Sequence, residues 1–208
     1  MKAPQLSAVR GHQERSKFVP GLSTYAFVEG GHVREGLDNI GAPWQDLHVY
    51  KLAQMAVRWT GDWWRGETLD LNQVYLYDAV SPETNGEDDD RDEQVTRWLE
   101  RNGDQKDVHV RYGRLAGERP ERRRQKGVDV QLAVDALSLA MNGVCDVAII
   151  VSGDADFIPV VEALRDRGTL VAICAFKKGL SKDLARQAGR VGYMPEDPAQ
   201  YQAWQLPG

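Results

Sequence analysis

The most constraining feature of the sequence is the segment 147–157, in which an apolar run stops abruptly at a polar turn. The run Val147–Val151 ends at a Ser-Gly pair, and the acids Asp154 and Asp156 follow. Apolar residues at helical spacing come next, so the segment predicts a buried parallel strand, a tight turn and a helix. Ligands bind at the carboxyl ends of strands in open α/β sheets, and hard divalent cations prefer oxygen ligands. The two acids therefore indicate a Mg²⁺ or Mn²⁺ site.

Strand-like runs alternate with helical patterns along most of the chain. This alternation predicts an α/β fold with a mostly parallel central sheet and helices on both faces. The basic stretch between Arg114 and Gln125 is expected to be a loop, and Ser181 is expected to cap the last helix. The expected strands are residues 24–28, 71–77, 107–112, 146–151 and 169–175. One expected helix begins at residue 32. The others cover residues 44–59, the region of 95–99, and residues 127–142, 156–166 and 181–188.

The length of 208 residues is enough for one sizeable α/β domain, which we expect over residues 21–194. Residues 1–20 are polar and are expected to form a mobile N-terminal tail. Residues 195–208 are expected to form a loose C-terminal tail, from which Trp204 could dock.

The apolar content is too scattered for a membrane protein. No apolar run is long enough to span a bilayer, and the N-terminus lacks the apolar core of a secretory signal peptide. We therefore expect a cytoplasmic protein with no membrane partner. Cys145 and Cys174, the only cysteines, adjoin apolar strand-like runs, and no Cys/His cluster has zinc spacing. Two buried free thiols in a reducing compartment are expected.

Charge is distributed unevenly along the chain. The net charge of −5 does not itself indicate nucleic acid, but an acidic run at 87–93 is followed by a basic tract within 111–126 and a basic cluster within 177–190. Local basic patches provide phosphate contacts, and the alternative for either cluster is a solvated surface. The basic residues are Arg111, Arg114, Arg119, Arg122, Arg123, Arg124 and Lys126, then Lys177, Lys178, Lys182, Arg186 and Arg190.

Three tryptophans, Trp59, Trp63 and Trp64, surround a short polar stretch. Two interpretations remain open for them: aromatic packing beneath a loop, or a platform for stacking bases.

Further acids stand where other predicted elements meet loops. Glu29 ends the first predicted strand, and Asp129 opens the predicted helix 127–142. If the first strand neighbours the strand before Asp154, then Glu29 lies beside Asp154 and Asp156, and Asp129 can close the ring. Such a cluster is electrostatically unfavourable unless it holds a cation. A divalent ion there could activate water for attack on a phosphodiester.

Each acid also has a simpler explanation. Asp154 can cap the following helix, and Asp156 and Asp129 are favourable in first turns. Asp135 lies on a polar helical stripe, for which a solvated face is the simpler account. Glu29 is harder to dismiss, because an acid between a buried strand and two glycines is not needed for the fold.

The sequence resembles the NYN domains of the LabA-like group within the PIN-like nucleases, over most of residues 24–193. The segment 152–157, SGDADF, is similar to the family's SGDxDF element and is followed by the same proline, Leu-Arg pair and glycine. The segment 126–135, KGVDVQLAVD, is similar to a second family element, and the weaker match at 27–32, FVEGGH, stands in the place of FIDGxN. The spacing of Ser181, Leu184 and Ala188 is similar to that of the family's closing helix.

This resemblance implies a Rossmann-like PIN domain and a metal-dependent ribonuclease. Carried over by position, it implies that Asp129, Asp154 and Asp156 are metal-site acids. It also implies that Ser152 supports the loop and that Asp135 helps to orient metal-bound water.

Three positions depart from the family pattern. Glu29 stands in the place of Asp, His32 in the place of Asn, and Gly189 where the closing helix often ends in Ala-Asp. Glu is one methylene longer than Asp, and a misplacement of about 1 Å can cost about a hundredfold in rate. The Glu is interpreted as natural tuning, a weakened enzyme or an engineered change. His32 could hydrogen-bond RNA or could simply start a helix.

The function expected from the sequence is hydrolysis of RNA phosphodiester bonds by a Mg²⁺- or Mn²⁺-dependent endoribonuclease. Glu29, Asp129, Asp154 and Asp156 are expected to hold the metal, with Asp135 and Ser152 as further catalytic residues. Single-stranded or looped RNA is favoured, because a recessed acid pocket reaches exposed backbone more easily than a duplex. The residues expected to bind RNA are His32, Arg122, Arg123, Arg124, Lys126, Lys177, Lys178 and Lys182.

Two other functions compete with this one. The departures at Glu29 and His32 motivate a non-catalytic or weakened RNA-binding module. A phosphohydrolase acting on small molecules ranks last, because its usual Asp-x-Asp follows the first strand, where this chain offers only Glu29. A homodimer is also compatible with the sequence.

Overall fold

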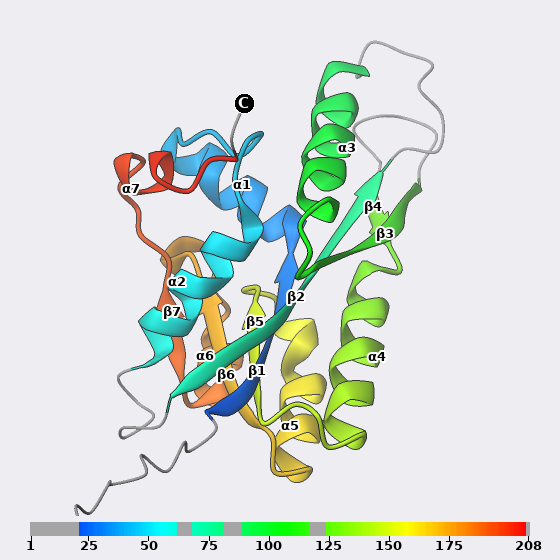
Figure 1. The fold of residues 1–208 in the computed structure, drawn as a ribbon, viewed down its shortest axis with the longest axis vertical. Coiled ribbons are helices and arrows are strands. Elements are labelled where there is room, and N and C mark those ends of the chain that lie inside the picture. The colour runs from blue at the N-terminus through cyan, green and yellow to red at the C-terminus, as the bar shows by residue number, and fades with distance from the viewer. Residues whose placement is uncertain (1–20, 62–67, 81–88, 117–123, 207–208) are drawn as a thin grey trace, which may run out of the picture.

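The computed structural model describes residues 21–61, 68–80, 89–116 and 124–206, and these residues form three layers (Figure 1). The central sheet has the strand order β4-β3-β2-β1-β5-β6-β7 within the described residues. Six of these strands run parallel, and β4 is antiparallel to β3. The strands are β1 Leu22–Glu29, β2 Leu69–Val80, β3 Val108–Ala116, β4 Arg124–Lys126, β5 Val147–Val151, β6 Leu170–Ala175 and β7 Val191–Tyr193.

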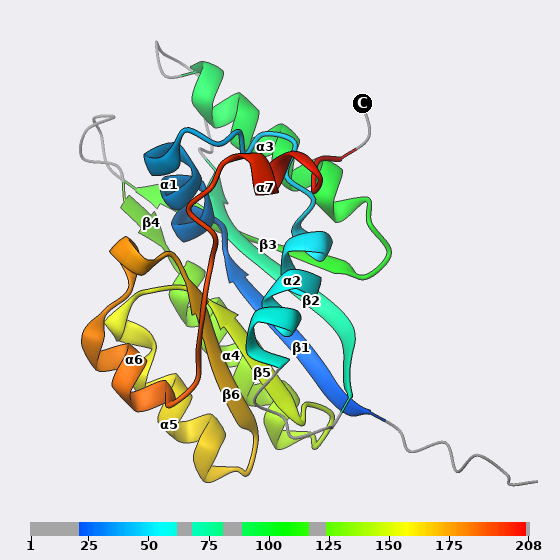
Figure 2. The ribbon, with the colours of Figure 1, turned by 90° about the vertical axis from the view of Figure 1, so that its left-hand side faces the viewer.

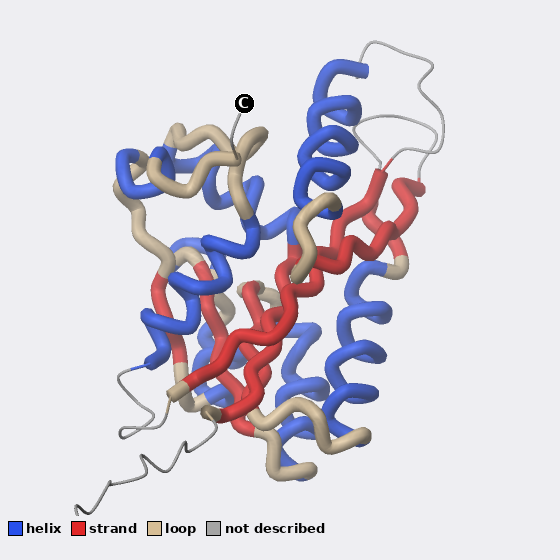
Figure 3. Tube along the Cα trace, in the orientation of Figure 1, coloured by secondary structure: helices blue, strands red, loops and turns tan. Residues whose placement is uncertain are grey.

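Helices cover both faces of the sheet, as the sequence predicts (Figures 2 and 3). Helices α1, α2, α3 and α7 pack on one face, and α4, α5 and α6 pack on the other. The α-helices are α1 Gly30–Ile40, α2 Val49–Gly61, α3 Asp89–Gly103, α4 Val128–Met141, α5 Ile158–Asp166, α6 Lys182–Ala188 and α7 Ala199–Gln202. Two 3₁₀ turns, η2 Ala155–Phe157 and η3 Lys177–Gly179, follow β5 and β6.

The central strands are apolar because both of their faces are covered. In β1, Ala26 and Val28 face the core under α1 and α2, whereas Phe27 faces the core under α4 and α5. All of β5 is buried. Parallel strands buried on both faces read as continuous apolar runs rather than as alternating patterns, which is why the sequence reveals them.

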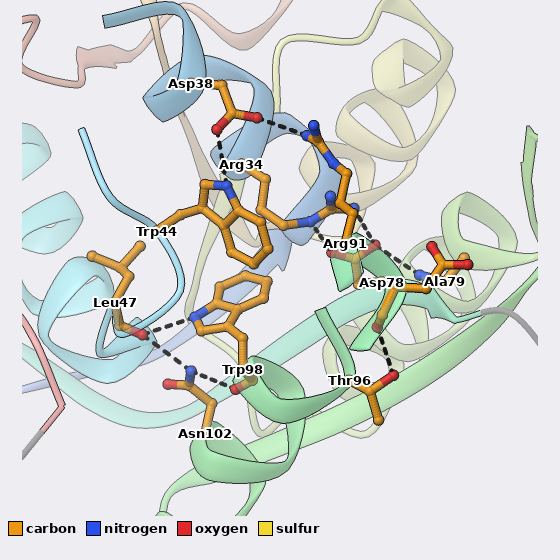
Figure 4. Close-up of polar contacts among 11 residues, drawn as sticks. Arg34, Asp38, Trp44, Leu47, Asp78, Ala79, Arg91, Thr96, Trp98 and Asn102 are labelled. Atoms are coloured by element: carbon orange, nitrogen blue, oxygen red, sulfur yellow. Dashed lines mark hydrogen bonds and ion pairs between the residues drawn. The ribbon is translucent and has the colours of Figure 1, made fainter. Parts of the chain in front are cut away.

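Polar side chains fix α1, α2 and α3 against one another (Figure 4). The indole N–H of Trp98 and the side-chain amide of Asn102 both donate to the carbonyl of Leu47, at 2.9 and 3.1 Å. The fully buried Asn102 also accepts a hydrogen bond from the N–H of Val49, which satisfies a free donor at the start of α2. On α1, Asp38 accepts from the indole N–H of Trp44 at 2.9 Å. These bonds tie the segment between α1 and α2 to both α1 and α3.

The prediction of a loop over Arg114–Gln125 is wrong at both of its ends. Strand β3 continues to Ala116, and Arg114 and Leu115 pair with Lys126 and Gln125 of β4. Pairing satisfies backbone groups that would otherwise be free at the sheet edge, and composition alone does not reveal it. Residues 117–123, with Arg119, Arg122 and Arg123, lie outside the described residues, as does the segment 1–20.

Residues 195–206 form a packed segment rather than the loose C-terminal tail that the sequence suggests. The ring of Tyr201 is fully buried, and its hydroxyl donates to the carbonyl of Pro195 at 2.8 Å. Trp204 docks, with its ring 4.9 Å from Tyr201 and 5.7 Å from Trp59 of α2. Burial of these large aromatic rings outweighs the polar composition of the segment.

The contact with Trp204 also places Trp59 in a packing role. Trp59 is partly buried against the core beneath α2, which favours packing over base stacking at this position. Trp63 and Trp64 lie outside the described residues.

The prediction of two buried free thiols is confirmed. Cys145 and Cys174 are both buried and unpaired, and burial raises the pKa of the Cys145 thiol to about 12. Within the described ranges, none of the helices combines the length and apolar character needed to cross a membrane.

Candidate active site

The carboxyl ends of β1 and β5 form the centre of the candidate site. The two strands are parallel neighbours with Val28 opposite Val151, so Glu29 and Ser152 leave the sheet side by side. The hydroxyl of Ser152 donates to Oε2 of Glu29 at 2.5 Å and accepts from the backbone N–H of Asp154 at 3.1 Å. The predicted adjacency of the two strands is thus confirmed, and Ser152 links Glu29 to the acidic turn.

The turn after β5 has the capping geometry that the simpler explanation predicts. Asp154 is the N-cap of η2, and its Oδ1 accepts the backbone N–H of Asp156 at 2.9 Å. A side chain at Gly153 would overlap the carbonyl of Gly179, so the turn packs directly on η3. The N–H of Ser181 then donates to the carbonyl of Gly153 at 2.9 Å. Capping occupies only one oxygen of Asp154 and therefore leaves it able to bind a cation as well.

Asp129 reaches the same region from the first turn of α4. The preceding Gly127 has φ of +86°, a left-handed conformation that glycine adopts without strain. Burial raises the pKa of Asp129, and the negative charges of Asp154 and Asp156 raise it further. Asp129 is therefore electrostatically coupled to the acidic turn.

Glu29 has the most perturbed carboxyl group of the site. Burial raises its pKa from 4.5 to about 7. The hydrogen bond from Ser152 lowers this pKa, whereas the charges of Asp129, Asp154 and Asp78 raise it. The structure thus brings the four sequence-predicted metal acids within electrostatic range: Glu29 interacts with Asp129 and Asp154, and Asp129 interacts with Asp156.

Asp78 is an acid of this edge that the sequence reasoning missed. It lies in β2 next to the residue opposite Glu29, is fully buried, and accepts two hydrogen bonds from the guanidinium of Arg34 at 2.8 and 2.9 Å. A side chain at Gly30 would overlap the carboxyl group of Asp78, so glycine is required there. The signal was available, since Asp78 follows the predicted strand 71–77 directly.

Asp135 lies apart from these acids. Its Oδ2 accepts hydrogen bonds from the hydroxyl of Tyr77 at 3.0 Å and from Nε of Arg111 at 2.9 Å. It lies six residues beyond Asp129 on α4, roughly 9 Å along the helix axis. Both donors bind the same oxygen, so Asp135 holds β2, β3 and α4 together. Its role in orienting water stays a prediction.

His32 lies in the first turn of α1, above the acidic turn. Its ring is 6.0 Å from the ring of Phe176, and its Cε1 lies 3.0 Å from where side chains at Gly153 and Gly179 would begin. Burial lowers the pKa of His32 to about 4, so the ring is neutral near pH 7. Its Nε2 is buried and has no hydrogen-bond partner among the described residues.

The predicted RNA-binding residues fall into two groups. Lys177 and Lys178 are exposed on η3, which packs on the acidic turn through Gly179, and Lys182 is exposed at the start of α6. Arg124 and Lys126 belong to β4, three strands from β1.

Helix α6 has the predicted N-cap, and the conformation at its C-terminus explains why Gly189 departs from the family pattern. The hydroxyl of Ser181 accepts the N–H of Leu184 at 3.4 Å, and the helix ends at Gly189 with φ of +69°. This left-handed C-cap accounts for glycine in the place of the family's usual residue.

An acid pocket of about 500 Å³ opens above these groups, lined by Glu29, Gly31, His32, Arg34, Glu35, Asp154 and Gly179. Across the described part of the chain, no group of three Asp, Glu, His or Cys side chains is placed to hold a metal ion. Mg²⁺, however, commonly binds through one or two carboxylates and keeps several waters. Glu29 and Asp154 provide such a pair in one pocket, and their mutual repulsion favours a cation. The donor set therefore fits a hard divalent ion.

Comparison with known proteins places the chain among NYN domains. The family model described as "NYN domain" matches residues 37–194. The chain is similar to the uncharacterized protein MJ0482 of Methanocaldococcus jannaschii, with 38% identity over 64 residues, which are 31% of this chain and 27% of that protein's length. A crystal structure of a protein of unknown function, VPA0982 from Vibrio parahaemolyticus, has the same fold, with a TM-score of 0.53 and 16% identity over 85% of this chain and 96% of that one.

Proposed function

This chain belongs to the NYN domain family, and we propose that it is a metal-dependent endoribonuclease whose active site is the acid pocket. The observation that carries the proposal is the position of Glu29 and Asp154 in one pocket, linked through Ser152, where burial and the charges of Asp129 and Asp154 raise the pKa of Glu29. Carboxylates that raise one another's pKa are stabilised as anions by a divalent cation, and strongly perturbed groups in a pocket mark functional sites.

The residues of the pocket have separate roles in this proposal. Glu29 and Asp154 hold the ion, while Asp129 and Asp156 add negative charge from the neighbouring elements. Ser152 fixes Glu29 and the acidic turn relative to each other through its two hydrogen bonds. The bound ion would supply a Lewis acid for a phosphoryl oxygen and a lowered pKa for its water.

The substrate in this proposal is single-stranded or looped RNA. Glu29 and Asp154 line the acid pocket together with Gly179 of η3. Exposed lysines lie on η3 and at the start of α6, namely Lys177, Lys178 and Lys182. Such lysines contact phosphates and make affinity fall with salt. Cleavage of a duplex at least as fast as of the matched single strand would contradict this choice of substrate.

The direct test is cleavage of RNA with and without Mn²⁺, in the unchanged protein and in Asp154→Asn. Asn retains the capping oxygen, so the turn should persist while the charge is lost. We expect Mn²⁺-dependent cleavage that falls by at least about a hundredfold in the variant. Asp183→Asn, which changes an exposed acid of α6, is the matched control and should cleave normally.

A second function, RNA binding without cleavage, is favoured by one observation. Glu29 is one methylene longer than the Asp of the family pattern, so an ion held there would be displaced. RNA binding without any metal-dependent cleavage in the same assay would select this function.

A further inference from the structure

A second cavity adjoins the acid pocket and has a different chemistry. It has a volume of about 520 Å³ and lies between α1, η3 and the segment after β7. His32, Glu35 and Gly179 line both cavities. We name the second cavity the base pocket; its other main lining residues are Asn39, Phe176, Lys178 and Glu196.

The floor of the base pocket is aromatic and fixed. Phe176 is almost fully buried, and its ring is 6.0 Å from His32 and 6.3 Å from Tyr201. A side chain at Gly36 would overlap the ring of Phe176, so the ring lies against α1 only because residue 36 is glycine. An apolar floor with a few polar groups at its rim is typical of pockets that bind small planar groups.

The charges of the rim favour a base over a phosphate. The lining residues include two acids, Glu35 and Glu196, and one cation, Lys178. The two carboxylates would repel the negative charge of a phosphate. The N–H groups of a nucleobase, by contrast, donate to carboxylates. His32, which lines both cavities, adds a buried Nε2 that has no hydrogen-bond partner in the described part of the chain.

Guanine matches this rim best among the RNA bases. Its N1–H and N2–H₂ donors lie side by side on one edge and can both donate to a single carboxylate. Adenine and cytosine offer one amino group next to an acceptor, and uracil offers one N–H between two carbonyls. A carboxylate therefore accepts two hydrogen bonds from guanine and only one from each other base.

We propose that the base pocket binds a guanine base of single-stranded RNA, with the adjoining phosphate directed toward the acid pocket. The inference rests on the proposed function for the RNA substrate, and it adds base selection to it. A base can enter this recess only if it is unstacked and turned out of the strand, which single strands allow.

The experiment measures binding separately from cleavage, in Asp154→Asn without metal. GMP, AMP, CMP and UMP are compared with short single-stranded RNAs that contain one guanine or none. We expect GMP to bind at least about tenfold more tightly than the other mononucleotides. The guanine-containing RNA should bind more tightly than GMP, because it adds phosphate contacts to the lysines. Equal binding of all four mononucleotides would overturn guanine selection, and RNA that binds no better than GMP would overturn the strand as occupant.

Glu196→Gln is the variant that isolates the base pocket, because Glu196 does not line the acid pocket. We expect the affinity for GMP to fall about 10- to 100-fold, with little change for UMP. The matched control is Glu100→Gln, which alters an exposed acid of α3 and should leave GMP binding unchanged. An unchanged affinity for GMP in Glu196→Gln would overturn the assignment of Glu196.

Cleavage mapping separates this inference from the proposed function. In the unchanged protein, cleavage sites should cluster beside guanines, and Glu196→Gln should lose that preference. If no RNA is cleaved but GMP binding still depends on Glu196, the nuclease fails and the base pocket stands. If RNA is cleaved without regard to guanine in both proteins, the base pocket fails and the nuclease stands.

Discussion

Glu29 ends β1, and Asp78 lies near the end of the neighbouring parallel strand β2, yet the two carboxyl groups have different partners. Asp78 is fully buried and accepts two hydrogen bonds from the guanidinium of Arg34. Glu29 is only partly buried and receives a hydrogen bond from the neutral hydroxyl of Ser152. Its pKa rises to about 7, and the charge of Asp78 contributes to that rise.

The difference shows that a position near the carboxyl end of a strand does not decide what an acid does. A carboxylate with a fixed guanidinium is a structural ion pair, because its charge is already compensated. A carboxylate surrounded by other acids is compensated by a cation that binds from solution. The partner, rather than the place in the sheet, separates the structural acid from the candidate functional one.

The largest expected effect comes from removing the guanidinium that faces Asp78. Arg34→Met should lower the free energy of unfolding by about 3–5 kcal/mol, because it leaves a buried carboxylate without its cation. Urea denaturation measures the change. Arg186→Met, which breaks an exposed ion pair with Asp183, is the control and should change stability by no more than about 0.5 kcal/mol. Equal effects of the two substitutions would remove the contrast between Asp78 and Glu29.

The next effect is the pH dependence of stability that Glu29 contributes. Its pKa is raised in the folded chain from 4.5 to about 7, so folding favours the protonated carboxyl group. The stability from this group is complete below the unfolded pKa and is lost as the pH rises through about 7, up to about 3 kcal/mol. Without metal, the unchanged protein should therefore lose more stability between about pH 5 and about pH 8 than Glu29→Gln.

Mn²⁺ provides the control for the pH experiment. A bound cation favours the ionised carboxylate, so saturating Mn²⁺ should stabilise the unchanged protein at about pH 8 and Glu29→Gln much less. Parallel pH profiles of the two proteins in the absence of metal would show that Glu29 has an ordinary pKa.

A third experiment tests the extra methylene of Glu29. If the longer side chain misplaces the ion, Glu29→Asp should raise Mn²⁺-dependent RNA cleavage by up to about a hundredfold. Initial rates at saturating Mn²⁺ measure the change, with Glu162→Asp as a matched change on α5. A lower rate in Glu29→Asp would show that Glu29 is the competent ligand for this pocket.

The smallest expected effect concerns the hydroxyl of Ser152. Ser152→Ala removes the hydrogen bond that lowers the pKa of Glu29, so this pKa should rise, and the free energy of unfolding should fall by about 1–2 kcal/mol at neutral pH or above. Carbon NMR of the carboxyl groups measures the pKa. Ser181→Ala removes the cap of α6 and should cost about 1 kcal/mol without moving the pKa of Glu29. A pKa of Glu29 that does not change in Ser152→Ala would contradict the role of this hydroxyl.

Much of the site could be predicted because its signals are local. The apolar run of β5, the Ser-Gly turn and the two acids lie within eleven consecutive residues, and their strand, turn and capping geometry depend on near neighbours. The shared pocket of Glu29 and Asp154 depended on the condition that β1 and β5 are neighbours, and the pairing of Val28 with Val151 fulfils it.

Contacts between distant segments were harder to predict. Arg34 and Asp78 are 44 residues apart in the sequence, and nothing in either neighbourhood indicates that they pair. The docking of Trp204 on Trp59 depends on how α2 and the last segment meet, so composition suggests a loose tail instead.

The sequence by itself determined the alternation of strands and helices, the family and the acids at the strand ends, because periodicity, turn residues and short motifs are local properties of the chain. Only the tertiary structure decided which acid is compensated. Arg34 on α1 reaches Asp78, whereas Ser152 reaches Glu29, and this choice sets their electrostatics. Electrostatic energies depend on the distance and burial of groups brought together by folding, and a sequence contains neither quantity.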